Sequence, residues 1–374
     1  MRRQILVAVF SHEPLLVKPQ REVKSVVGDD DSPCPSYAIH DVKYREEFVR
    51  NFQAVLIGTV ALLCSAAAQT AQADDFPARP VRIVVAFPPG GPTDFVGRLV
   101  ADKMTQSLGQ RVYIDNKPGA NGTLGGGDVA KSDPDGYSLF LTTAGAVTVS
   151  PHIMPSMPYD TLRDFAPVAL VTKVTEVLVV TPKFGIKTVK ELVALAKDKP
   201  GTIPFASTGI GSPPHLAQVL LDTSAGVQFL HVPYRGAAPA LTDLLGGQVQ
   251  VVALDIPVVI AQIQAGNLVP IGVASNKRDA ILPDVPTLAE QGYPNTDASN
   301  WYALLAPAKT PPDVIAKLNK AVNDALNDPA VHDKLVKAGA TPVGGTPEVL
   351  GTFMKTEYEK WGRVVHDNNI KDTQ

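Results

Sequence analysis

Short apolar runs alternate with amphipathic stretches along the chain from residue 76 onward. Residues 81–87 (VRIVVAF) form an apolar run that is typical of a parallel strand buried on both faces. In residues 95–109 the apolar side chains fall on one stripe of a helix, and Gly109 is a typical helix end. The pattern repeats beyond this point, and repeated strand–helix–strand units predict an α/β fold with parallel strands joined by right-handed crossovers.

The alternation restarts near residue 175, and a returning apolar strand with three helices completes the chain after residue 299. Two sets of units predict two lobes. We expect residues 74–174 together with 300–374 to form the first lobe and residues 175–299 to form the second. The two crossings, near Val174 and Ser299, would make a two-segment hinge.

The turns that follow the predicted strands are where we expect a ligand, because open α/β sheets bind ligands beyond the carboxyl ends of their strands. In FPPGGPTDF (87–95), Gly91 is the predicted N-cap and Pro92 takes the first helical position. The unpaired N–H groups of Thr93 and Asp94 would then suit an anion, because a helix N-terminus carries roughly half a positive charge.

Several later turns have a similar composition. STGIGSPPH (207–215) copies the first arrangement, with Ser212 as the predicted N-cap. NKPGANGTLGGG (116–127), TTAG (142–145) and YRG (234–236) add bare amides and hydroxyl groups. We expect backbone amides at the two proline-initiated helix starts to hold the anion, rather than a salt bridge to a basic side chain.

Other chemistries are not indicated. The chain has no P-loop, no dinucleotide-binding fingerprint and no G-x-S-x-G motif, so we expect no cofactor and no catalysis. His152, His215 and His231 lack metal-ligand spacing. The net charge of −3 and the absence of a basic stripe argue against nucleic acid. Trp301 and Tyr302 are interpreted as packing at a crossing.

The N-terminal region predicts secretion. Residues 52–68 (FQAVLIGTVALLCSAAA) follow two arginines and precede AQA at 71–73, which is the arrangement of a signal peptide. We assign residues 49–73 to the signal peptide. Residues 1–48 are interpreted as an extension that is either not translated, because the start site is placed too early, or disordered. Both cysteines, Cys34 and Cys64, precede the cleavage site.

Five collinear blocks resemble a known family. They are FPPGGPTDFVGRLVADKM, NKPGANGTLGGGDVAKSDPDGYSLFLTT, LRDFAPVALV, HVPYRGAAPALTDLLGGQVQV and KRDAILPDVPTLAEQGYP. Together they are similar to the extracytoplasmic receptors of tripartite tricarboxylate transporters, also called the Bug family, and the resemblance spans residues 76–370.

The resemblance implies a type II periplasmic binding protein fold, with two Rossmann-like lobes around a ligand cleft. It implies a monomeric periplasmic receptor that passes a small carboxylate to an integral-membrane permease. The carboxylate would be a di- or tricarboxylate, an acidic amino acid or an aromatic acid. The family's pocket positions fall on Phe87, Gly90, Gly91, Thr93, Asp94, Thr143, Ala144, Ser207, Thr208, Gly209, His215, Tyr234 and Asp255.

Two departures from the family pattern are visible. Arg235 stands where the family often has lysine, which keeps the charge. Residues 254–259 (LDIPVV) are apolar where many members have a more polar strand end, so the ligand cannot be taken from a relative. One alternative function is a ligand sensor that docks on a membrane kinase. A cleft enzyme is the other alternative, and it would need a nucleophile or an acid–base pair in the cleft.

Export predicts a defined mature end. We expect cleavage after Ala73, because AQA supplies the small-x-small exit that signal peptidase requires. N-terminal sequencing of periplasmic protein should read Asp74-Asp75-Phe76. Mature protein that still carries residues 1–40 would contradict both the cleavage site and the interpretation of the extension.

Overall fold

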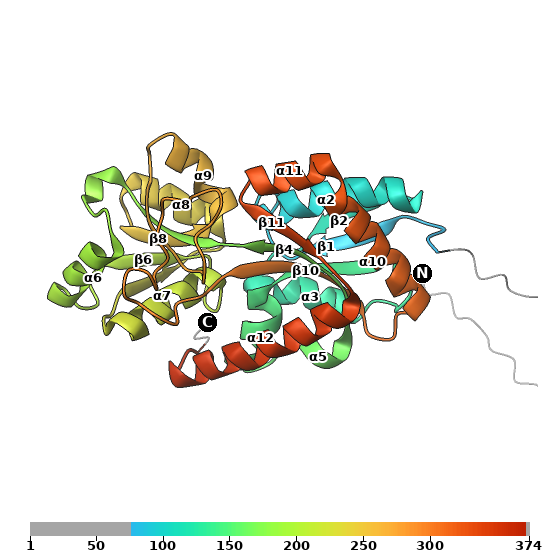
Figure 1. Cartoon of the computed structure of the whole chain (residues 1–374). Helices are drawn as coiled ribbons and strands as arrows, with labels where there is room; N and C mark the ends of the chain where they lie inside the picture. Colours follow the sequence, from blue (N-terminus) through green and yellow to red (C-terminus); the bar gives the residue numbers. More distant parts are fainter. Residues whose placement is uncertain (1–75, 372–374) are drawn as a thin grey trace, which may run out of the picture. The chain divides into compact units, whose positions relative to one another are not determined.

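The computed structural model describes residues 76–371, which form two β-sheets with helices packed against them (Figure 1). The first sheet has the strand order β11-β4-β10-β3-β1-β2. Its strands are β1 (Val81–Val85), β2 (Val112–Asn116), β3 (Ser138–Thr143), β4 (Phe165–Val174), β10 (Asn300–Pro307) and β11 (Ala340–Gly344). The second sheet has the order β7-β6-β8-β5-β9. Its strands are β5 (Glu176–Val180), β6 (Pro204–Ser207), β7 (Leu230–Pro233), β8 (Val251–Asp255) and β9 (Val269–Val273).

The helices follow the strands in both sets. Those that accompany the first sheet are α2 (Pro92–Leu108), α3 (Thr123–Ala130), α4 (Ser150–Ile153), α5 (Thr161–Asp164), α10 (Pro312–Asn327), α11 (Pro329–Lys337) and α12 (Pro347–Asp367). Those that accompany the second are α6 (Val189–Asp198), α7 (Pro213–Ala225), α8 (Ala237–Gly246) and α9 (Ile256–Gln264). Three short helical segments are the 3₁₀-helices η1 (Ala120–Gly122) and η3 (Pro182–Phe184) and the π-helix η2 (Gly145–Val149).

Strand β1 is buried on both faces, as its apolar run predicts. Val81, Ile83 and Val85 belong to the core that includes α2 and α10, whereas Val84 belongs to the opposite core beside α3 and α12. Successive side chains of a strand point to opposite faces, so a strand covered on both sides needs apolar residues at nearly every position. The α/β architecture inferred from the sequence is confirmed.

The prediction of parallel sheets is wrong for the strands that lead into and out of the crossings. Strands β1, β2 and β3 pair in parallel, as do β6, β7 and β8. By contrast, β4 and β10 pair antiparallel with each other, and β5 is antiparallel to both β8 and β9. Parallel neighbours require a crossover connection, usually a helix, between the two strands. A strand that the chain enters directly from the other sheet has no such connection before it, so it can run antiparallel to its neighbours.

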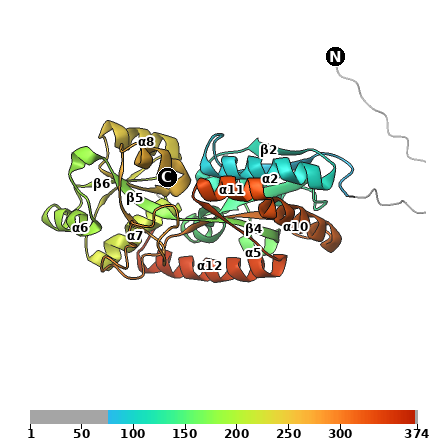
Figure 2. The same cartoon turned by 45° about the horizontal axis from the view of Figure 1, so that its top comes forward.

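The chain passes from the first sheet to the second at Thr175, the single residue between β4 and β5, and returns where β10 begins at Asn300. Helix α12 also spans from the first sheet to the second (Figure 2). Its first half packs through Leu350 and Met354 into the core of the first sheet, and Trp361 lies in the core of the second. The assignment of lobe boundaries and of a hinge at these crossings stays a prediction.

Both tryptophans of the chain bind one carboxylate on α12. The indole Nε1 of Trp301, on β10, donates to Oε2 of Glu357 at 3.2 Å, and Nε1 of Trp361 donates to the same oxygen at 3.0 Å. Both rings are 1% exposed. A partly buried carboxylate thereby gains two donors, and β10 is fixed against α12.

The helix ends follow the local sequence signals. Gly91 is the N-cap of α2 with Pro92 at its first position, and Gly109 closes the same helix in the left-handed conformation. Thr188 and Glu191 form both bonds of the predicted capping box at α6. These predictions are confirmed.

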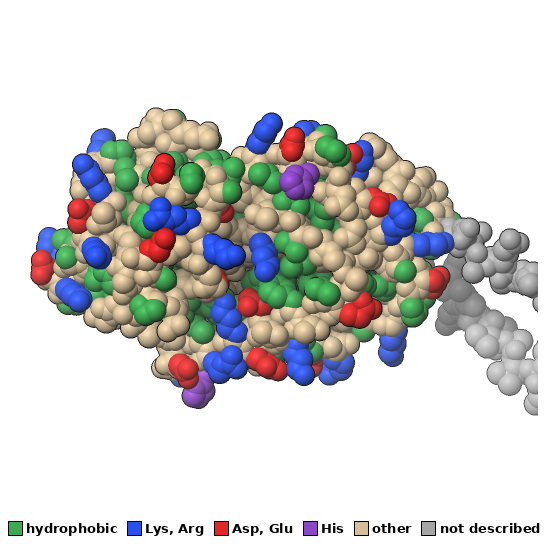
Figure 3. All heavy atoms as spheres, in the orientation of Figure 1, with side chains coloured by type: hydrophobic (Ala, Val, Ile, Leu, Met, Phe, Trp, Pro, Cys, Tyr) green, Lys and Arg blue, Asp and Glu red, His purple; other side chains and the backbone are tan. Residues whose placement is uncertain are grey.

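Some predictions fall beyond the part of the chain that the structure describes. The signal peptide at 49–73, the extension at 1–48 and both cysteines lie outside the described residues. Among residues 76–371, no helix has the length and apolar character to cross a membrane. On the face shown in Figure 3, acidic and basic side chains are interspersed rather than gathered by sign.

The packing of α3 predicts a size limit at Gly126. A Cβ there would lie 2.5 Å from the Tyr159 ring and 3.0 Å from the Phe140 ring, both of which are buried. We expect Gly126→Ala to lower the free energy of unfolding by about 1–3 kcal/mol through overpacking. Gly351→Ala, on α12, is the matched control, because its Cβ would meet Pro167 at 3.5 Å, an ordinary contact. It should raise stability by about 0.5–1 kcal/mol through helix propensity. Urea denaturation measures the free energy of unfolding of both variants. Equal changes in the two variants would contradict the close packing at Gly126.

Candidate ligand-binding site

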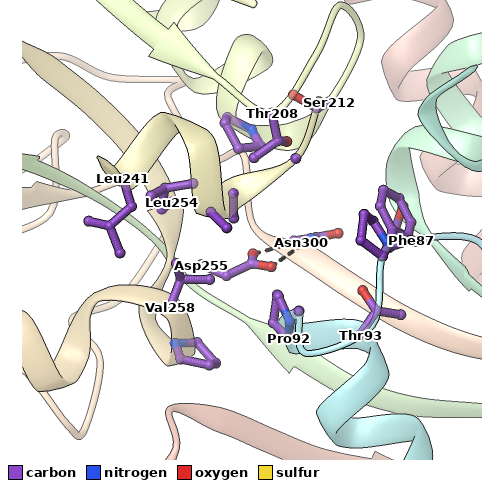
Figure 4. Close-up of a pocket in the computed structure, with 18 of the residues that line it drawn as sticks. Phe87, Pro92, Thr93, Thr208, Ser212, Leu241, Leu254, Asp255, Val258 and Asn300 are labelled. Atoms are coloured by element: carbon purple, nitrogen blue, oxygen red, sulfur yellow. Dashed lines mark hydrogen bonds between the residues drawn. The ribbon is translucent and has the colours of Figure 1, made fainter. Parts of the chain in front are cut away.

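A cavity of about 510 Å³ lies where the strand-to-helix turns of the two sheets face each other (Figure 4). In Figure 4, Phe87 and Thr93 project from the first-sheet side, while Leu254 and Val258 project from the second. The volume is in the range of sites for small organic ligands. The site therefore forms at the carboxyl ends of strands, where α/β proteins bind their ligands.

Seven of the thirteen residues that the resemblance implies line this cavity. They are Phe87, Gly90, Gly91, Thr93, Thr143, Thr208 and Asp255. The exposed side chain of Arg235 and the predicted N-cap Ser212 also line it. That these residues contact a ligand stays a prediction. The other six do not line the cavity: Asp94, Ala144, Ser207, Gly209, His215 and Tyr234.

Asp94 fixes the loop before α2 rather than facing the cavity. Its carboxylate accepts hydrogen bonds from the Gly90 amide at 2.9 Å, from Arg98 at 2.9 Å and from Asn116 Nδ2 at 3.0 Å. Burial opposes ionisation, but the bonds from Arg98, Gly90 and Asn116 outweigh it and hold the pKa of Asp94 below its usual value. The loop from Phe87 to Asp94 is thus fixed by these hydrogen bonds before any ligand binds.

Three helices begin at the cavity with no side-chain cap. The N-caps Gly91 of α2, Gly236 of α8 and Asp255 of α9 accept no capping bond through a side chain. Within the described residues, the N–H groups of Thr93 and Ala238 have no hydrogen-bond partner. Uncapped first-turn amides carry partial positive charge and can receive an anion.

The first-sheet side also offers a hydroxyl group. Thr143, at the end of β3, lines the cavity and is 3% exposed. Its Oγ1 has no hydrogen-bond partner within the described residues. A buried hydroxyl without a partner costs free energy, so this group is ready to bond a ligand or a water molecule.

The expectation that α7 also supplies bare amides is wrong. Pro213 and Pro214 occupy its first two positions, and proline has no N–H group. The next amide, of His215, donates to Oγ of Ser212 at 3.4 Å, and that of Leu216 donates to the Ser212 carbonyl at 3.0 Å. The N-terminus of α7 is therefore closed by its own cap. At the start of α9 the Ile256 amide donates to the Thr175 carbonyl and Pro257 has no N–H group, so on the second-sheet side the free amide is that of Ala238 on α8.

Ser207, Gly209, His215 and His231 form a network beneath the loop before α7. Ser207 Oγ and His231 Nε2 are hydrogen-bonded at 2.7 Å, and the two imidazole rings stack with centroids 4.0 Å apart. The Gly209 amide donates to Ser207 Oγ, and the Gly211 amide donates to Nδ1 of His215 at 3.1 Å. Ser207 is fully buried, and neither Ser207 nor His231 lines the cavity.

The two remaining residues also have contacts within the protein. Tyr234 donates its hydroxyl hydrogen to Asp243 at 2.7 Å. Desolvation, with the negative Asp243 adding to it, raises the pKa of Tyr234 to about 12. Ala144 is 1% exposed and packs in the core beside α3 and α12.

Asp255 joins the cavity to the return crossing. Its carboxylate accepts from Asn300 Nδ2 at 3.1 Å and from the Tyr302 hydroxyl at 2.5 Å. Glu176 is its cross-strand neighbour on β5, and the Glu176 carboxyl group is fully buried. Complete burial, followed by the charge of Asp255, raises the pKa of Glu176 well above its usual value, so Glu176 is held as the neutral acid.

Sequence reasoning missed several lining residues. Asn121 and Asn300 contribute amide side chains, and Leu241 contributes an apolar one, whereas Leu254 and Val258 belong to the run 254–259 that the sequence links to the ligand. Asn121 lies inside the glycine-rich run of 116–127, which is a usable signal. The predicted packing residues Trp301 and Tyr302 are buried and do not line the cavity.

The cavity offers the groups that bind a small polar molecule. Within residues 76–371, no group of three or more His, Cys, Asp or Glu side chains could hold a metal ion. The cavity surface combines free amides, hydroxyl groups and apolar side chains from two separate sheets. An α/β protein with such a site between two sheets belongs to the class of two-lobed solute-binding proteins.

Comparison with known proteins identifies the family. Residues 96–370 match the family model described as tripartite tricarboxylate transporter family receptor. The chain is 41% identical to Protein BugT of Bordetella pertussis over 300 residues, which cover 80% of this chain and 92% of that protein.

Two solved structures are similar over most of the chain. Rpa4515 of R. palustris with adipate is 33% identical, with a TM-score of 0.76, and the match covers 79% of this chain and 99% of that one. MatC from Rhodopseudomonas palustris with bound malate is 34% identical, with a TM-score of 0.73, and the match covers 78% and 100%. The chain belongs to the tripartite tricarboxylate transporter receptors of the Bug type, which are periplasmic solute-binding proteins and not enzymes.

The stacked histidines predict a pH-dependent stability. Burial, with His231 adding to it, lowers the pKa of His215 to about 3, and burial lowers that of His231 to about 4. Below pH 6.5 these two histidines take up protons in the unfolded chain, whereas in the folded protein they stay neutral. The free energy of unfolding that they contribute therefore falls as the pH falls from 6.5 toward 4.

The double substitution His215→Asn, His231→Gln keeps acceptors near the ring nitrogens and removes the titration. Between pH 7.5 and pH 5, we expect the parent to lose on the order of 4 kcal/mol more stability in urea denaturation than this variant, about 2 kcal/mol for each histidine. Asp222, whose pKa burial raises to about 7, titrates in the opposite sense but is present in both proteins. Identical pH profiles would contradict the neutral, buried histidine pair.

Proposed function

We propose that this receptor captures a small carboxylate in the cavity between its two sheets and delivers it to a tripartite membrane permease. The observation that carries the proposal is the meeting of two uncapped helix starts, at Gly91 of α2 and Gly236 of α8, around one cavity. The relatives with adipate and with malate support a carboxylate as the class of ligand. The family supports the permease as the partner.

The carboxylate is held by backbone amides and hydroxyl groups. The Thr93 amide, the unpartnered Thr143 hydroxyl and the Asn121 side chain all lie on the first-sheet side of the cavity. Hydrogen bonds from such groups to an anion contribute roughly 1.5–3 kcal/mol each. Asp94 already fixes the loop, so little conformational entropy is lost on binding. Arg235 is exposed at the rim, where solvent weakens its attraction for the ligand.

Delivery requires that the permease distinguish loaded from empty receptor. Movement of the two sheets about the crossings at Thr175 and Asn300 would supply that signal. Helix α12 packs into both cores, so it would have to bend or slide as the sheets approach. The ligand would thereby stabilise the arrangement of the sheets that the permease recognises.

A thermal-shift screen of small carboxylates against the mature protein tests the proposal. A ligand at 100 times its Kd stabilises the folded state by about 2.7 kcal/mol, which is a clear rise in melting temperature. Failure of every mono-, di- and tricarboxylate to bind would sink the proposal. Rapid turnover of a hit would instead favour an enzyme.

Gly91→Val tests the role of the glycine loop in this binding. Its branched side chain would stand at the cavity surface on the N-cap of α2, and we expect calorimetry to show no measurable binding. Gly246→Val, at the far end of α8 with open space around it, is the matched control and should bind normally. Arg235→Ala should weaken binding by less than about tenfold. A hundredfold loss in Arg235→Ala, with Gly91→Val nearly silent, would place the anion on the guanidinium instead.

A further inference from the structure

One wall of the cavity is apolar and continuous with the protein core. Leu241 of α8, Leu254 of β8 and Val258 of α9 lie together in Figure 4, across the cavity from Phe87 and Thr93. Leu254 is 1% exposed and belongs to the core of the second sheet, and the other two pack against that core. These three residues are called the apolar wall below.

The apolar wall offers an ionised group few partners. The α9 N-terminus adjoins it, but Pro257 removes one of the first amides there. An ionised carboxylate placed against Leu241 and Val258 would lose water without gaining equivalent bonds, which is costly. An alkyl or aromatic group in the same place would instead gain from leaving water.

Asp255 acts in the same direction as the apolar wall. It is 8% exposed, lies between the two sides of the cavity, and accepts hydrogen bonds from the uncharged donors Asn300 and Tyr302. Within the described residues no cation pairs with it, and its carboxyl neighbour Glu176 brings no positive charge. A second negative group on the ligand that lies against the apolar wall would therefore also be repelled by Asp255, in a site of low dielectric constant.

We infer that this receptor selects monocarboxylates with an apolar body, an alkyl chain or an aromatic ring, over di- and tricarboxylates. The single carboxylate lies on the first-sheet side, near Thr93 and Thr143, and the apolar body lies against the apolar wall. The inference rests on the proposed function and narrows its class of ligand. It also explains what the apolar run at 254–259 does in the folded protein.

Matched ligand pairs test the selectivity. Hexanoate and adipate share a six-carbon chain and differ only in the second carboxylate, and benzoate and terephthalate form the aromatic pair. We expect isothermal titration calorimetry on the mature protein to show the monocarboxylate of a pair binding at least about tenfold more tightly. Equal or tighter binding of the dicarboxylate, or a tricarboxylate as the tightest ligand of the screen, overturns the inference while leaving the proposed function intact. If no carboxylate binds at all, the proposed function itself has failed.

Two substitutions separate the contributions of the apolar wall and the charge. Val258→Thr puts a hydroxyl group of similar size into the apolar wall at the third position of α9, and hexanoate or benzoate should bind roughly three- to tenfold more weakly. Val349→Thr makes the same change at the third position of α12, where Val349 is 58% exposed, and should leave binding unchanged. An unaltered affinity in Val258→Thr would mean that the ligand body does not touch the apolar wall.

Asp255→Asn removes the charge and keeps an oxygen that Asn300 and Tyr302 can still donate to. We expect the ratio of hexanoate affinity to adipate affinity to shrink, because the second carboxylate of adipate is no longer repelled and adipate binds more tightly. Circular dichroism and the melting temperature establish that the variant is folded. A folded variant that loses both ligands to the same extent would show that Asp255 supports the site without setting its selectivity.

Discussion

The site depends on the way that strand β10 is held between the two sheets. β10 pairs antiparallel with β3 and β4 in the first sheet, and its first residues donate hydrogen bonds to Asp255 at the end of β8 in the second. Glu176 lies beside Asp255 on the other crossing strand, and its raised pKa keeps it neutral. The cluster therefore avoids two adjacent negative charges in a buried place, which would force the strands apart. The cavity opens directly above these contacts.

The features that depend on neighbouring residues could be predicted from the sequence. The Gly91–Pro92 start of α2 and the Thr188–Glu191 capping box each depend on residues within four positions of one another. The direction of β5 could not be predicted in this way, because it depends on where the chain enters the second sheet. The same holds for Asn300 and Leu241, which reach the cavity only after distant segments pack together. The closed start of α7 is different, since Pro213 and Pro214 show in the sequence itself that two N–H groups are missing.

The two sides of the cavity have different kinds of surface. The first-sheet side is built from backbone and from short polar side chains, and Asp94 fixes its loop through bonds to Gly90, Arg98 and Asn116. The second-sheet side presents side chains of α8 and α9 that are only partly buried, Leu241 and Val258 among them. Substitution of a partly buried side chain at a helix start disturbs the fold little. A receptor scaffold of this kind can therefore change its ligand by altering one side while the anion-binding backbone of the other stays the same.

The carboxylate of Glu357 gives the molecule an optical property. Because the chain contains only two tryptophans and both donate to this one group, all indole emission arises from the contact between β10 and α12. Trp301 directly follows Asn300, which lines the cavity, and Trp361 lies in the core of the second sheet. Any displacement of β10 against α12 would alter the distance of an indole from a negative charge, and with it the emission wavelength. The unlabelled protein thus carries a fluorescent reporter at the junction of its two sheets.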